Sequence, residues 1–137
     1  MENEFKNQIF HRGIELPKAI ADHFTGKAYF NQLVEGGNDW NCPVGYVTFQ
    51  PGCRNFWHRH PGGQILLVTE GNGWYQEWGQ EARYLNPGDV VMIPSGAKHW
   101  HGASKDSWFA HIYIETNSDM GSVEWLEEVS EEQYSAL

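Results

Sequence analysis

Short combinations of glycine, proline and asparagine interrupt this chain repeatedly, and their close spacing limits the folds that it can adopt. They lie at residues 36–38, 51–52, 61–63, 71–73, 86–88 and 94–96. Such combinations mark turns, because glycine reaches backbone angles that other residues avoid and proline fixes its own. The segments between them are short and rich in valine, isoleucine, threonine and aromatic residues, which favour strands. This pattern is typical of an all-β antiparallel sandwich or barrel.

The individual strands are predicted from the runs between these turns. The clearest runs cover residues 44–50, 64–70, 73–80, 82–85, 90–93 and 108–115. Residues 1–27 show a mixed pattern. We expect an N-terminal arm over residues 1–39 that carries a strand of its own.

The end of the chain has a different pattern from the rest. Trp125, Leu126 and Val129 have helical spacing, and Ser130 with Gln133 fits a helix-capping box. We therefore expect a short, acidic helical tail over residues 118–137 that packs outside the strands.

Composition and charge limit the classes of partner. The chain has 137 residues, the usual size of a single domain, and a net charge of −9. Nucleic acids and anionic membranes both select a basic surface, so neither is expected as a partner. No apolar stretch approaches the length that spans a membrane. A small molecule is the expected ligand.

The first residues and the cysteines bear on the compartment. The segment Met1–Lys6 has neither the basic nor the apolar region of a signal peptide. Two cysteines, Cys42 and Cys53, do not make a disulfide framework. We expect a cytoplasmic protein with reduced thiols, and we interpret Cys53 as a packing residue rather than a metal ligand, although it lies near His58.

Two histidines and an amide form a candidate metal site. His58 and His60 are two residues apart, so on a strand they point to the same side. Gln64 opens an apolar run, and burying its amide is costly unless a metal or a hydrogen-bond network satisfies it. Imidazole is the commonest metal-ligand side chain. The alternatives are an exposed His-x-His pair and a hydrogen-bonded core glutamine.

The wider pattern resembles the two consensus motifs of the cupin superfamily. The first motif is the stretch from Gly52 to Gln64 followed by Gly71, and the second runs from Gly88 to His99. The resemblance implies a cupin jelly-roll (double-stranded β-helix) barrel over about residues 40–115, within one domain over residues 1–137. It also implies four ligands to one metal ion in the barrel mouth, namely His58, His60, Gln64 and His99. Three imidazoles and an amide oxygen suit a divalent first-row transition metal.

This sequence departs from the usual cupin pattern at two positions. The usual glutamate ligand is Gln64, and the asparagine that often closes the second motif is Ala103. A neutral amide leaves a divalent ion with its full charge, which makes it a stronger Lewis acid. The change favours lyase, isomerase or decarboxylase chemistry over oxygenase chemistry.

A longer stretch is similar to small bacterial cupins associated with carboxymuconolactone decarboxylase, some of which are manganese-dependent hydroxynitrile lyases. The similar segments are residues 58–64, 69–74, 87–91, 98–103, 123–125 and 132–134. This resemblance implies the same four ligands, manganese first and iron, zinc, nickel or cobalt as alternatives, and His111 as the catalytic base. It also implies a homodimer or homotetramer.

His111 is a candidate base from its strand position as well. In the run from Phe109 to Glu115, alternate residues share a face, so His111, Tyr113 and Glu115 point together. If that face is inward, an imidazole lies within reach of a bound substrate. The alternative is an exposed or structurally hydrogen-bonded histidine. His101 has the same parity as His99 and is either an orienting residue or a structural one.

The remaining candidates follow from strand parity and from closeness to the motifs. We expect a pocket for a small aromatic or aliphatic substrate, with ordinary core packing as the alternative. Its candidate residues are Gly45, Val47, Phe49, Arg54, Phe56, Met92, His101, Tyr113 and Glu115. Trp57 and Trp100 alternate with the ligands, so we expect them to face away from the metal and to pack outside, in a dimer interface. His11 and His23 are expected at the surface.

The sequence thus supports a metal-dependent lyase that acts on a carbon–carbon bond next to a hydroxyl, with the metal as Lewis acid. Two alternatives remain open. One is a non-catalytic cupin that anchors a small ligand through its metal, and the other is a cupin dioxygenase, which would consume oxygen.

Overall fold

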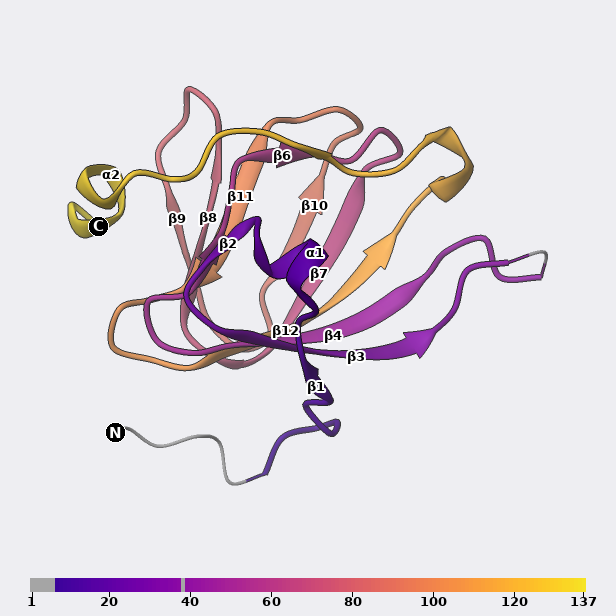
Figure 1. The fold of residues 1–137 in the computed structure, drawn as a ribbon, viewed down its shortest axis with the longest axis horizontal. Coiled ribbons are helices and arrows are strands. Elements are labelled where there is room, and N and C mark those ends of the chain that lie inside the picture. Colours follow the sequence, from indigo (N-terminus) through magenta and orange to yellow (C-terminus); the bar gives the residue numbers. More distant parts are fainter. Residues whose placement is uncertain (1–6, 38) are drawn as a thin grey trace.

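The computed structural model describes residues 7–37 and 39–137 and shows two antiparallel sheets that face each other (Figure 1). The first sheet contains, from edge to edge, β1 (Ile14–Glu15), β3 (Ala28–Val34), β4 (Val44–Phe49), β12 (Phe109–Glu115), β7 (Gln64–Gly71) and β10 (Val90–Ile93). The second contains β13 (Glu124–Trp125), β6 (His58–Arg59), β11 (His99–Ala103), β5 (Arg54–Asn55) and β2 (Phe24–Thr25), and β8 (Gly73–Glu77) joins β11 to β9 (Arg83–Leu85). The all-β fold expected from the turn spacing is confirmed.

Helices contribute little to this fold. They are α1 (Lys18–Ala21), the 3-10 turn η1 (Ser118–Met120) and α2 (Glu131–Ser135). None of the helices in the described residues has the length and apolar character that crossing a bilayer requires.

All six predicted strands form, and their ends differ from the prediction by three residues or fewer. The N-terminal arm contains β3, and its first six residues lie outside the described part of the chain. Strand β11 was not among the predicted strands, because Gly102 weakens a strand pattern. Gly102 is required there because a Cβ atom would lie 2.5 Å from the Cα atom of Arg54 on the paired strand β5.

The core lies between the two sheets. Strand β7 alternates buried and half-buried side chains, so that Leu66 and Val68 point inward. They pack with fully buried residues of other strands, such as Phe49 and Phe109. Gln64 shares this buried face with Leu66 and Val68, because alternate residues of a strand point the same way, so one face of β7 supplies both core residues and a candidate ligand.

The C-terminal tail covers two large indoles. Trp57 and Trp100 are almost completely buried, and they pack against Val129 and Tyr134 of the tail. They do lie away from the candidate metal site, as expected, but their assignment to a dimer interface was wrong. The chain's own tail removes these side chains from solvent.

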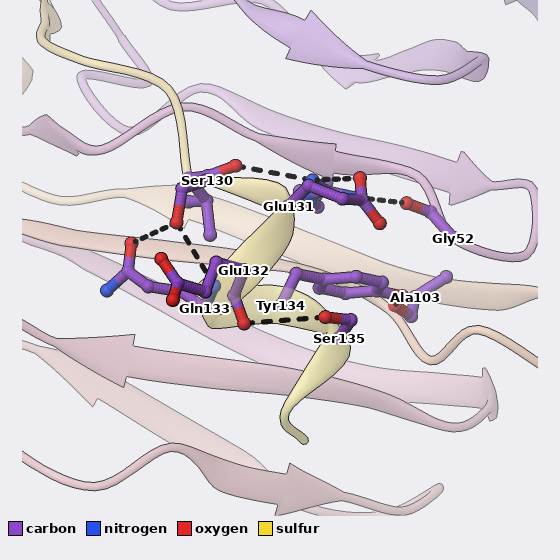
Figure 2. Close-up of polar contacts among 10 residues, drawn as sticks. Gly52, Ala103, Ser130, Glu131, Glu132, Gln133, Tyr134 and Ser135 are labelled. Atoms are coloured by element: carbon purple, nitrogen blue, oxygen red, sulfur yellow. Dashed lines mark hydrogen bonds and ion pairs between the residues drawn. The ribbon is translucent and has the colours of Figure 1, made fainter.

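The tail is less helical than its spacing predicted. The short helix is confirmed, but it begins only at Glu131, and the backbone N–H of Gln133 donates to the Ser130 side chain at 3.0 Å as the capping pattern requires (Figure 2). Trp125 instead belongs to β13 and pairs with His58. This tertiary contact overrides the local helical spacing.

Tyr134 links the tail to the barrel through a hydrogen bond and a cation–π contact. Its hydroxyl donates to the carbonyl of Ala103 at 2.6 Å, and Figure 2 shows the ring directed at that residue. The guanidinium of Arg54 lies 4.1 Å from the centre of the same ring.

The Tyr134 hydrogen bond yields a stability prediction. Tyr134→Phe is expected to lower the free energy of unfolding by about 1 to 2 kcal/mol, because the Ala103 carbonyl loses its buried partner. Urea denaturation monitored by circular dichroism measures the change. Tyr84→Phe, at a tyrosine that is 46% exposed, should have almost no effect, and equal effects of the two substitutions would contradict the prediction.

Candidate metal centre and substrate pocket

Three buried histidines from two strands and one turn converge on one point. His58 of β6 and His99 of β11 are direct partners across the second sheet, with ring centroids 4.2 Å apart. His60 follows β6, and its ring centroid lies 5.0 Å from that of His58 and 5.6 Å from that of His99. One ligand nitrogen from each residue lies within 4.8 Å of the other two. The structure thus brings together the three histidines that the sequence selected.

The turn between His60 and Gln64 depends on its two glycines. Gly63 has φ +87°, in the left-handed region that glycine adopts without strain. At Gly62 a Cβ atom would lie 2.2 Å from the carbonyl oxygen of Thr116. The turn closes with the Gly63 N–H donating to the His60 carbonyl at 3.0 Å. It therefore sets Gln64 at the start of β7, close to the histidines.

The hydrogen bonds of the three rings fix their tautomers. The Nδ1 atom of His58 donates to the Phe56 carbonyl at 2.7 Å, and that of His99 donates to the Ala97 carbonyl at 2.9 Å. The Nδ1 atom of His60 lies 3.1 Å from a carboxylate oxygen of Glu115. Carbonyls and carboxylates only accept, so Nδ1 carries the proton in each ring. Because these contacts engage Nδ1 in each ring, Nε2 is the atom that could bind a metal ion.

The residues fit a metal ion. The Nε2 atom of His99 and the Oε1 atom of Gln64 are buried, and neither has a hydrogen-bond partner among the described residues. Buried polar atoms are normally paired, and a metal ion would satisfy both. Three imidazole nitrogens and an amide oxygen suit a divalent first-row ion.

Burial keeps two of the candidate ligands, His58 and His99, in the neutral form that binds metal. It lowers the pKa of His99 to about 4. Burial also lowers the pKa of His58 well below its ordinary value, and the neighbouring His99 and His60 add to that shift. Both imidazoles are therefore neutral at pH 7, as a metal ligand must be.

A cavity of about 330 Å³ opens on this centre. That volume is at the lower end of the about 300 to 1,000 Å³ typical of small-ligand sites. One part of the wall is polar and contains His58, His60 and Gln64. The other part is apolar and aromatic: Leu16, Ile20, Phe24, Phe30, Val47, Phe49, Tyr113 and Trp125.

A second pair of histidines lies in the same cavity. The Nε2 atom of His111 on β12 is 3.2 Å from the Nδ1 atom of His101 on β11. The side chain of Asn55 accepts a hydrogen bond from the His101 backbone N–H at 2.9 Å, and its amide nitrogen lies 3.3 Å from the His101 Nε2 atom. Burial lowers the pKa of His111 to about 3 and that of His101 well below its ordinary value, so the pair is neutral at pH 7.

Comparisons with known proteins decide the family. The cupin domain model matches residues 45–113. The (R)-mandelonitrile lyase of Granulicella tundricola is 42% identical over 117 residues, which cover 85% of this chain and 89% of that protein. The chain is a cupin. The jelly-roll barrel and the family that the two motifs indicated are both confirmed.

Solved structures agree with this assignment. A cupin-like protein of Thermotoga maritima has 47% sequence identity with this cupin and a TM-score of 0.89, over 95% of this chain and 96% of that one. The DMSP lyase DddQ of Ruegeria pomeroyi has 20% identity and a TM-score of 0.63, over 90% of this chain and 62% of that one. This second similarity shows the shared fold alone.

Five of the predicted pocket residues of this cupin line the cavity together with His111: Val47, Phe49, His101, Tyr113 and Glu115. Gly45 lies beneath them, since a Cβ atom there would come within 2.3 Å of the Tyr113 ring. The inward face predicted for His111, Tyr113 and Glu115 is therefore the face that the structure shows.

Three of the predicted pocket residues lie elsewhere. Met92 is 76% exposed, because Val91 and Ile93 take the inward positions of β10. The carbonyl of Phe56 accepts a hydrogen bond from His58, and the Phe56 ring packs edge-on against His23. The guanidinium of Arg54 is buried under the tail, where it donates to the Val129 carbonyl at 3.2 Å.

The two histidines outside the motifs have different surroundings. His11 is exposed, as expected. His23 was wrongly placed at the surface: it is half-buried and stacks on Trp125, with ring centroids 4.7 Å apart and the planes 2° from parallel. Trp125 in turn lies 4.9 Å from the His58 ring.

Some wall residues were missed by sequence reasoning. Leu16, Ile20 and Phe24 come from the N-terminal arm, and Trp125 comes from the tail. They are far from the motifs along the chain, so no local spacing links them to the ligands. Asn55 was missed because β5 is only two residues long and shows no alternation.

Proposed function

We propose that this cupin is a metal-dependent lyase that cleaves a carbon–carbon bond next to a hydroxyl, with an aromatic cyanohydrin as a substrate. One observation carries the proposal: the buried centre of His58, His60, Gln64 and His99 opens on a cavity that also contains the His101–His111 pair. Metal ligands and a neutral imidazole acceptor thus border one space. The 42% identity to an (R)-mandelonitrile lyase supports the same reaction.

The aromatic wall supports the substrate class. Phe24, Phe30, Phe49, Tyr113 and Trp125 line the cavity around the polar end. Aromatic side chains bind an aryl group by burying its surface and by edge or offset contacts. A phenyl-substituted cyanohydrin has an apolar ring for this wall and a hydroxyl for the polar end.

The four proposed ligands would hold one divalent ion, for which manganese is our first candidate and iron, zinc, nickel and cobalt are alternatives. When bound, the ion supplies Lewis acidity that lowers the pKa of the substrate hydroxyl. Gln64 would contribute no charge to that ion as a direct ligand.

We assign the proton transfer to His111. In the neutral form that burial favours, its imidazole accepts the hydroxyl proton. The electrons of the O–H bond then form the carbonyl, the carbon–carbon bond breaks, and its electron pair leaves with cyanide. His101, whose Nδ1 atom is 3.2 Å from the His111 Nε2 atom, shares the positive charge that this transfer creates. Cyanide then takes the proton from His111, so the products are an aldehyde and hydrogen cyanide and the neutral base is restored.

The test begins with protein purified without added metal. We expect elemental analysis to find about one equivalent of a divalent first-row ion, as one three-histidine site requires. We also expect (R)-mandelonitrile to release benzaldehyde, followed by its ultraviolet absorbance, faster than in protein-free buffer. Metal without any cyanohydrin cleavage would overturn the lyase proposal, and no metal even after reconstitution with Mn²⁺ would overturn the metal centre as well.

A further inference from the structure

We infer that Glu115 is a positioning residue of the metal centre: it holds His60 in the tautomer that binds metal and supplies the negative charge that Gln64 lacks. The inference rests on the proposed function, since it concerns the same centre. Glu115 is the last residue of β12 and the direct partner of Gln64 on β7. The carboxylate thus lies beside the position where cupins usually have a glutamate ligand.

The contact with His60 is close and sheltered. The Oε2 atom of Glu115 lies 3.1 Å from the His60 Nδ1 atom, and the two side chains are 25% and 10% exposed. The backbone of Glu115 is itself fixed, because its N–H donates to the Pro43 carbonyl at 2.9 Å. A charged acceptor in a partly dry site forms a stronger hydrogen bond than a neutral one.

Glu115 differs from the acceptors of the other two rings. His58 and His99 donate to the backbone carbonyls of Phe56 and Ala97, which are neutral. His60 instead faces the carboxyl group of an acidic side chain. A carboxylate on the far nitrogen makes an imidazole more basic and a better donor to a metal. The negative charge of the site is therefore on Glu115, which contacts the proposed ligand His60, and not on a direct ligand of the metal.

This arrangement has a chemical consequence. An ion held by three imidazoles and an amide would have only neutral direct ligands. The Glu115 carboxylate, which does not bind the ion directly, would offset one of its two positive charges from behind His60. The ion gains affinity from the nearby charge but still has neutral direct ligands, which favours Lewis-acid chemistry. The second oxygen, Oε1, is buried without a hydrogen-bond partner among the described residues, so no other contact there draws the charge away from His60.

The test is a titration of the metal-free protein with Mn²⁺ alone, in competition with a chelator. Glu115→Gln keeps the size and an oxygen acceptor but removes the charge, and we expect it to weaken Mn²⁺ binding by about 10- to 100-fold. Glu115→Asp keeps the charge and should recover part of the loss. Glu70→Gln, the same change at a carboxylate that accepts from the Tyr46 hydroxyl on the same sheet, is the matched control and should bind like wild type.

A measurement on the wild-type protein complements the variants. In a ¹⁵N-histidine NMR spectrum of the metal-free protein, His60 should carry its proton on Nδ1. A proton on Nε2, or Mn²⁺ affinities of wild type and Glu115→Gln within about twofold, well below the change expected, would overturn the inference. Both readouts are independent of turnover, so a protein that binds Mn²⁺ but cleaves no cyanohydrin overturns the proposed function and leaves this inference standing.

Discussion

Replacement of His99 by alanine should empty the metal centre and abolish lyase turnover. His99 is completely buried, and its Nε2 atom has no other partner among the described residues. Loss of an outer partner of a ligand already weakens metal binding by about 10- to 100-fold, so the loss of a direct ligand should weaken it by more. Elemental analysis and the rate of (R)-mandelonitrile cleavage measure the two effects on one preparation.

Two further variants make the His99 result specific. His99→Gln has a side chain closer to the histidine in size, so it separates the loss of the ligand from the cavity that alanine leaves. His11→Ala removes an exposed histidine away from the cavity and should keep both metal and rate. If His99→Ala folds and retains about one equivalent of metal, the residue is not a ligand and the proposed centre is wrong.

His111→Ala should have the opposite combination of effects: metal is retained and turnover is lost. Removal of a general base typically costs about 10²- to 10⁴-fold in rate, and we expect a decrease of at least about 100-fold in kcat. His111 contacts His101 and belongs to a strand of the first sheet, so its loss leaves the three histidine ligands in place. Initial rates at saturating Mn²⁺ and elemental analysis provide the two measurements.

The same variant separates the functions that the sequence left open. A non-catalytic binding cupin would show no turnover in wild type, and His111→Ala would leave its ligand affinity intact. A dioxygenase would consume oxygen, which an oxygen electrode detects. A His111 variant that cleaves cyanohydrin at the wild-type rate would remove the residue from the mechanism, and one that loses its metal would assign it a structural role.

Local spacing selected His58, His60 and Gln64 as candidate ligands, and the resemblance to cupins added His99. His60 and Gln64 are separated by a turn whose glycines cannot be replaced without strain or clash, so residue identity and backbone shape specify each other. The inward face of His111, Tyr113 and Glu115 followed from strand alternation. In these cases the information lies within a few residues of the chain.

The errors arose where position depends on distant segments. Alternation puts Met92 on one face of β10 but does not say which face is inward, and the pairing with β7 decides this. The spacing of Trp125 with Leu126 and Val129 predicted a helix, yet the pairing of Trp125 with His58 makes this residue part of a strand. Trp57 and Trp100 face away from the ligands as predicted, but only the fold shows that the tail covers them. The expected homodimer or homotetramer stays a prediction.

The lining of the cavity comes from two parts of the chain. The segment that matches the cupin family, residues 45–113, holds all four proposed ligands and His111. Leu16, Ile20, Phe24 and Trp125 also line the cavity but lie outside this segment, in the N-terminal arm and the C-terminal tail. Substitutions at these four positions would therefore change the shape of the cavity wall while leaving the four proposed ligands and His111 as they are.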